Sequence, residues 1–91
     1  MNLNSILFID SYPKLDLHGI TGDIARVMID DFINDNIKMH NEIIVIIHGL
    51  GKGILKDVTL KCLKNNKKVL DFKLAYNNPG STLVKLNLTS K

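Results

Sequence analysis

The stretch "IIVIIHGLGKG", residues 43–53, decides the fold, because an unbroken run of β-branched residues leads directly into a glycine-rich turn. Five successive Ile and Val residues are typical of a strand that is covered on both faces, as in the centre of a parallel sheet. Apolar residues then recur at helical spacing from 54 to 63, which predicts a helix. The stretch therefore predicts a strand, a turn and a helix in immediate succession.

A similar succession occurs earlier, in "KLDLHGIT", residues 14–21. Apolar and polar side chains alternate over residues 14–18, which predicts a half-buried strand. Thr21 is a suitable N-cap, and apolar residues recur at helical spacing from 24 to 33, so a helix is predicted there.

The second half of the chain adds two more predicted strands, at residues 68–75 and 82–88. Between them, "NNPG" at 77–80 predicts a turn, because Pro and Gly suit turns and break regular structure. The order β-α-β-α-β-β predicts an α/β fold, a two-layer domain with a mixed four-stranded sheet and two helices over residues 14–91. Residues 1–13 are expected to form an N-terminal arm or an edge strand.

Two His-Gly pairs are expected to lie at one edge of this sheet. A strand-helix-strand connection is right-handed in nearly all proteins, so the first two strands should be parallel neighbours. Their C-terminal ends then share the edge at which open α/β sheets usually bind ligands. His18 and His48, although 30 residues apart in sequence, are therefore predicted to lie at the same edge.

The glycine-rich turn has the features of an anion site. Glycine lets the main chain approach a ligand closely, and the helix that follows presents free N–H groups with a partial positive charge. Lys52 lies within the turn and Lys56 one turn into the helix, so both ammonium groups are placed to join the same phosphate. The alternative is that a tight strand-to-helix turn needs its glycines for packing alone.

Charge is distributed unevenly along the chain. Residues 1–47 have a charge balance of −4 and residues 48–91 a balance of +7. This asymmetry favours a polyanionic partner for the second half, and the alternative is a set of solvated lysines. Cys62 is the one cysteine, which fits a reducing compartment and excludes a Cys-based zinc site. No apolar run is long enough to cross a membrane and no signal peptide is recognisable, so a cytoplasmic protein is expected.

The motifs "LDLHG", "HGLGKG" and "GSTLVKL", in this order, resemble the Smr (small MutS-related) domain family over residues 14–88. The resemblance implies a β-α-β-α-β-β fold like that of the C-terminal domain of translation initiation factor three. It also implies nucleic-acid binding, and several members are endonucleases that nick DNA or cut RNA, some of them at stalled ribosomes. This sequence differs from many relatives at Leu50, where they have lysine, and at Lys56, where they have arginine.

The resemblance implies a catalytic role for Asp16, His18 and His48. It implies contacts to the phosphate backbone for the glycines of the two motifs, and the two lysines join them, which gives the set Gly19, Gly49, Gly51, Lys52, Gly53 and Lys56. In the catalytic interpretation the Asp16 carboxylate orients the His18 imidazole, which moves a proton from an attacking hydroxyl or water. In the structural alternative, His18 caps the turn and Asp16 ties it down.

The role of His48 has four alternatives: acid/base catalysis, phosphate contact, metal binding, or stabilisation of the loop. A divalent ion such as Mg²⁺ is the less favoured cofactor, because two histidines and one aspartate are a sparse set for an ion that prefers oxygen ligands. Three functions remain open: an Smr-type endonuclease, a non-catalytic RNA- or DNA-binding module that acts on ribosome-bound RNA, and a protein-interaction module.

Overall fold

The computed structural model describes residues 2–6, 9–51, 53–76 and 78–89. In chain order its elements are a 3-10 helix η1 (Leu3–Ser5), β1 (Lys14–Asp16), α1 (Gly22–Lys38), β2 (Ile43–Ile47), α2 (Ile54–Lys64), β3 (Val69–Ala75) and β4 (Asn78–Leu86).

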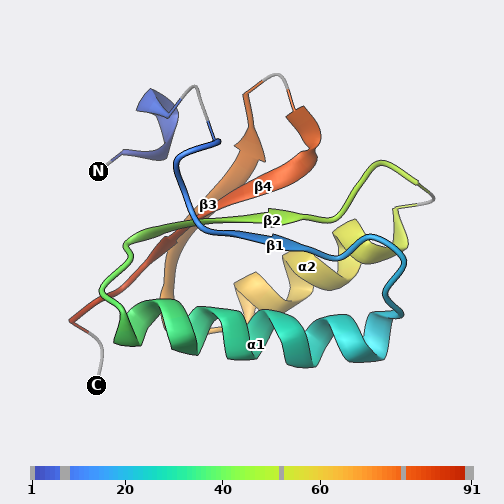
Figure 1. Cartoon of the computed structure of the whole chain (residues 1–91), viewed down its shortest axis with the longest axis horizontal. Helices are drawn as coiled ribbons and strands as arrows, with labels where there is room; N and C mark the ends of the chain where they lie inside the picture. The colour runs from blue at the N-terminus through green and yellow to red at the C-terminus, as the bar shows by residue number, and fades with distance from the viewer. Residues whose placement is uncertain (1, 7–8, 52, 77, 90–91) are drawn as a thin grey trace.

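The four strands form one sheet in the order β1-β2-β4-β3. The pair β1–β2 is parallel, and β4 is antiparallel to both of its neighbours. Both helices cover the same face of the sheet, as Figure 1 shows. The predicted α/β fold, two layers with a mixed four-stranded sheet and two helices, is therefore confirmed.

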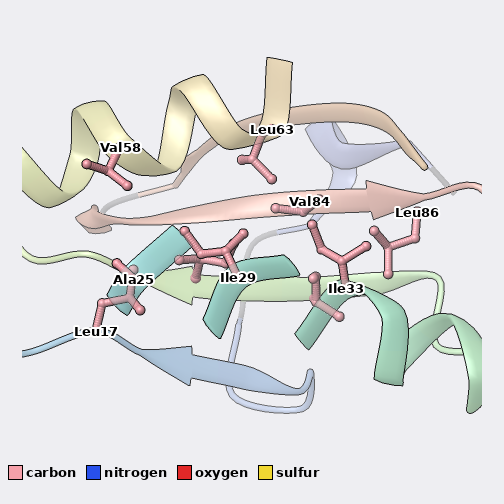
Figure 2. Close-up of a cluster of buried hydrophobic side chains, with 10 residues drawn as sticks. Leu17, Ala25, Ile29, Ile33, Val58, Leu63, Val84 and Leu86 are labelled. Atoms are coloured by element: carbon pink, nitrogen blue, oxygen red, sulfur yellow. The ribbon is translucent and has the colours of Figure 1, made fainter. Parts of the chain in front are cut away.

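The central strand β2 is covered on both faces, as its unbroken β-branched run predicts. Ile44 and Ile46 face the helices and belong to a buried cluster with α1 and α2 side chains such as Ile29 and Leu63. Figure 2 shows Ile29 and Leu63 pointing from the two helices into this cluster. The alternate residues of β2 pack in a second cluster, whose other members come from the N-terminal segment and from β3 and β4: Leu3, Ile6, Ala75 and Leu83. The N-terminal segment thus covers the second face of the sheet (Figure 1).

Helix α1 extends five residues beyond the apolar repeat at 24–33 and closes in a Schellman motif. His40 has a left-handed conformation, with φ 60°. The N–H of His40 donates to the Ile37 carbonyl at 3.0 Å, and the N–H of Asn41 donates to the Asn36 carbonyl at 2.9 Å. Both bonds satisfy carbonyls that the helix end leaves open, although glycine is the usual residue at the left-handed position.

The predicted turn at 77–80 is wrong for Asn78, Pro79 and Gly80, which belong to β4, while Asn77 lies outside the described residues. Pro79 is tolerated in this central strand because the pairing of β2 with β4 ends at Ile47 and Ser81, before the proline is reached. The first strand also ends earlier than predicted, at Asp16, because a turn begins at Leu17, whose carbonyl accepts from the N–H of Ile20. Within the described part of the chain, no helix is long and apolar enough to span a bilayer.

Candidate functional site

The C-terminal ends of β1 and β2 lie side by side. Asp16 is the register partner of Ile47, and the N–H of Leu17 donates to the Ile47 carbonyl at 2.9 Å. The turn that carries His18 and the loop that begins at His48 therefore leave the sheet from adjacent strand ends. We call this edge, residues 16–22, 48–51 and 53–56, the glycine-loop rim.

Asp16 and His18 are both exposed at this rim, but their side chains do not form a catalytic pair in this structure. One carboxylate oxygen of Asp16, Oδ1, accepts a hydrogen bond from the backbone N–H of His18 at 2.9 Å. Among the described residues, nothing makes a hydrogen bond to the His18 imidazole. Asp16 therefore stabilises the turn that presents His18, and leaves the ring open to solvent.

His48 is buried, with 5% of its surface exposed, and both of its ring nitrogens are engaged. Nδ1 lies 3.0 Å from the carbonyl oxygen of Gly49, and Nε2 lies 2.8 Å from Oγ1 of Thr82. Because a carbonyl oxygen can only accept, Nδ1 must carry a proton. In the neutral ring Nε2 is then an acceptor, and the Thr82 hydroxyl donates to it.

The faces of the sheet separate Asp16 from His48. Side chains alternate along a strand, so Asp16 shares the face of its partner Ile47, while His48 continues the helix-side series of Ile44 and Ile46. The structure therefore brings the two motifs to one rim, but Asp16 and His48 approach it from opposite faces.

The main chain of β4 also holds the start of the loop that begins at His48, which we call the glycine loop. The carbonyl of Gly80 accepts from the N–H groups of His48, at 3.0 Å, and Gly49, at 2.9 Å. A Cβ at Gly80 would lie 3.4 Å from the Cα of Gly49, so β4 and the loop that follows β2 approach closely there. The sequence analysis placed Gly80 in a turn and Thr82 in a strand and gave neither a role at the site, although both stand in "GSTLVKL", the third motif of the resemblance.

The glycines of the rim differ in what the protein itself requires of them. Gly19, Gly49 and Gly53 have φ values of 76°, 78° and 82°, a region that favours glycine. Gly51 lies outside that region, and a Cβ there would meet no atom of the described residues within 4 Å, its chain neighbours apart. Turn geometry therefore explains three of these glycines, whereas neither the backbone angle nor a contact with the described residues beyond the chain neighbours requires glycine at position 51. The predicted ligand Lys52 lies outside the described residues.

A hollow of about 420 Å³ opens between the first turns of α1 and α2. Its lining is mainly aliphatic, and it includes one cationic side chain and the buried imidazole: Ile20, Leu50, Ile54, Leu55, Lys56 and His48. Neither helix has a side-chain cap at this end, where the N-caps are Thr21 and Gly53. The hollow is therefore next to unpaired N–H groups of two helices and to the half-buried Lys56.

Within the part of the chain that the structure describes, no group of three or more His, Cys, Asp or Glu side chains is placed to hold a metal ion. Asp16 and His48 lie on different faces, and both nitrogens of His48 are occupied by protein groups. The residues present thus do not fit a Mg²⁺ ion held by protein side chains alone.

Comparison with known proteins agrees with this architecture. The Smr domain family model matches residues 15–87. The endonuclease MutS2 of Helicobacter pylori is 38% identical over 73 residues, which cover 80% of this chain and 10% of that protein. This chain therefore spans about a tenth of the length of that relative.

Two solved structures have the same fold. The crystal structure of the Smr domain of Thermus thermophilus MutS2 superposes with a TM-score of 0.79 at 26% identity, covering 82% of this chain and 98% of that one. YdaL, a stand-alone small MutS-related protein from Escherichia coli, superposes with a TM-score of 0.78 at 23% identity, covering 84% of this chain and 67% of that one. By its sequence motifs, its family match and its fold, this chain belongs to the Smr domain family.

Proposed function

We propose that this protein binds the phosphate backbone of RNA or DNA at the glycine-loop rim and cleaves it as an endonuclease. The observation that carries the proposal is the convergence, on one edge of the sheet, of an exposed imidazole, a glycine loop and a cationic side chain. Homology to a protein named endonuclease MutS2 supports the class of reaction.

Binding of the backbone rests on the loop and on Lys56. The free N–H groups at the start of α2 favour an anion, and the Lys56 ammonium adds a full positive charge beside them. Gly51 supports close approach of a ligand, because neither the backbone conformation nor the packing of the protein requires glycine there. Lysine contacts a phosphate as a point charge, so this site is suited to backbone contact and not to reading of sequence.

For cleavage, we assign the proton transfer to His18. Its exposed imidazole is free to accept the proton of the attacking hydroxyl or water, whose oxygen forms a bond to phosphorus. The bond from phosphorus to the leaving oxygen breaks, and that oxygen keeps the electron pair and takes up a proton from water. Asp16 acts through the backbone of the turn that presents His18. His48, with both nitrogens occupied, acts as a positioning residue for the loop.

A non-catalytic RNA- or DNA-binding module, such as one that recognises ribosome-bound RNA, is the second candidate. Both ring nitrogens of His48 are hydrogen-bonded within the protein, so His18 is the one imidazole at the rim that is free to move a proton. A rim with a single free imidazole favours the binding module. Under this alternative the same loop and Lys56 would hold the backbone, and Asp16 and His18 would serve the turn alone.

Cleavage assays separate the two candidates. Purified protein is incubated with labelled single-stranded RNA and with supercoiled plasmid, in Mg²⁺ and in EDTA, so that metal dependence is measured at the same time. If the protein is an endonuclease, the wild type should give a cleavage product that is lost in His18→Ala and retained in His40→Ala. His40 is a control, because it is exposed at the end of α1. Binding of both substrates without any product from the wild type would reject the enzyme and leave the binding module.

A further inference from the structure

We infer that the hollow between α1 and α2 is a subsite for one unstacked nucleobase of a single-stranded nucleic acid. The inference rests on the proposed function and adds to it, because it assigns affinity to a base as well as to the phosphates. At the phosphate site, positive charge would bind the backbone, whereas in this subsite apolar surface would bind the base.

The chemistry of the hollow suits a flat, neutral heterocycle. Its volume of about 420 Å³ is within the range of small-molecule pockets, roughly 300–1,000 Å³. Ile20, Leu50, Ile54 and Leu55 provide an aliphatic lining. Proteins that hold a base outside its stack commonly place it between aromatic or apolar side chains.

Two of these side chains are unusually open for their type. Leu50 is 68% exposed and Ile54 is 62% exposed, and both lie within five residues along the loop and the start of α2. Covering such apolar surface is favourable because it is removed from water. Leu50 also stands between Gly49 and Gly51, so its side chain has no bulky chain neighbour to cover it.

The position of the hollow identifies a nucleobase as its occupant. Lys56 is part of the same lining, and the loop that ends at Gly53 borders it, so the hollow is continuous with the proposed phosphate site. A base is joined to its own phosphate by a single sugar, and a strand held by its backbone at the loop therefore presents a base to the hollow. Apart from the His48 imidazole, whose two nitrogens are already hydrogen-bonded within the protein, the described lining has no aromatic ring and its one cationic side chain is Lys56. Few groups are therefore placed to tell one base from another, and the hollow should accept any of them.

The test compares two ligands with equal numbers of phosphates: a short single-stranded oligonucleotide, as DNA and as RNA, and its fully abasic counterpart. Fluorescence anisotropy gives both affinities for the wild type, for the double variant Leu50→Ala/Ile54→Ala and for Leu70→Ala. Leu70 is a matched control, since it is an apolar residue with 56% exposure near the N-terminal end of β3 and so at the opposite edge. Thermal melting of each variant checks that it is folded.

Wild type and Leu70→Ala should bind the intact oligonucleotide about fivefold more tightly than the abasic one, because a base in the hollow removes apolar surface from water. This preference should disappear in Leu50→Ala/Ile54→Ala, whose affinity for the abasic ligand should stay that of the wild type. As a second readout, 2-aminopurine in the oligonucleotide should become brighter on binding the wild type, because it leaves its stack, and not on binding the double variant.

Equal affinity of the wild type for the intact and abasic ligands would overturn the base subsite and leave the phosphate site standing. The same holds if the double variant retains the preference. Loss of binding to both ligands at low salt would instead reject the proposed function, and the subsite with it.

Discussion

The Nε2 atom of His48 and the Oγ1 atom of Thr82 lie 2.8 Å apart in a buried hydrogen bond that joins the end of β2 to β4. Together with the two N–H groups that donate to the Gly80 carbonyl, this bond fixes the start of the glycine loop to the sheet. The loop that is proposed to hold phosphate is therefore positioned by β4, a strand about 30 residues further along the chain.

Thr82→Val removes the hydroxyl from this bond and keeps the shape of the side chain. Because Nε2 of the buried His48 then has no partner, the free energy of unfolding should fall by about 1–3 kcal/mol, measured by urea denaturation. Affinity for single-stranded nucleic acid should fall as well, since the loop is less well fixed.

The conservative variant Thr82→Ser keeps the hydroxyl and serves as the control. It should retain the affinity of the wild type for nucleic acid, although it loses a buried methyl group. If Thr82→Val binds as tightly as Thr82→Ser, the bond between His48 and Thr82 does not position the loop.

Gly51→Ala should separate ligand approach from turn geometry. The backbone at Gly51 is outside the left-handed region and the added methyl group meets no described residue beyond its chain neighbours. The free energy of unfolding should therefore stay constant or rise by up to about 1 kcal/mol. Affinity for nucleic acid should nevertheless fall, because the methyl group occupies the space in which the phosphate backbone approaches.

Gly49→Ala is the contrasting variant, since φ at Gly49 is 78° and the substitution should cost about 1–2 kcal/mol of stability. Stability is measured by thermal melting and affinity by anisotropy for both variants. Unchanged affinity in a stable Gly51→Ala protein would show that this glycine is not reserved for a ligand.

The sequence was sufficient to predict the layers and the rim, because both depend on local patterns. The run of Ile and Val at 43–47 identified the central strand, and the right hand of the crossover placed His18 and His48 at one edge. The sequence did not predict which face of the sheet each site residue lies on, because this depends on where each strand ends and how it pairs. The separation of Asp16 and His48 onto opposite faces follows from a register that only the paired strands define.

The partners of His48 were not predictable for a similar reason. Thr82 is 34 residues away in sequence, and the antiparallel register of β2 with β4 brings it beneath the rim. Pro79 and Gly80 also misled the prediction, because they are turn residues in isolation and here continue a strand past the end of its neighbour. No local sequence pattern shows that a central strand extends beyond the end of the strand it pairs with.

Lys56→Ala should weaken binding of nucleic acid and reduce its dependence on salt. Removing one contact between lysine and phosphate should lower the slope of log affinity against log salt concentration by about 1. Lys38→Ala is the charge-matched control, because Lys38 is exposed in the last turn of α1, away from the rim. Equal salt slopes for the two variants would remove Lys56 from the proposed phosphate site.

His40→Gly should stabilise the protein without altering binding. His40 occupies the left-handed position of the Schellman motif, which costs a non-glycine residue about 1–2 kcal/mol. Part of this gain is offset by the greater freedom of glycine in the unfolded chain, so the free energy of unfolding should rise by about 0.5–1 kcal/mol in urea denaturation. His40→Ala retains the Cβ and should bring no comparable gain, and an equal gain in both variants would argue against backbone strain as the cause.

Mapping the bound nucleic acid on the protein tests the central claim most directly. Amide chemical shifts of isotope-labelled protein, recorded during titration with single-stranded RNA and with DNA, should change most at residues 17–22, 48–51 and 53–56, the two connections that leave β1 and β2. Changes concentrated instead on the N-terminal segment and the face of the sheet that it covers, or at the C-terminal end of α1, would contradict the account.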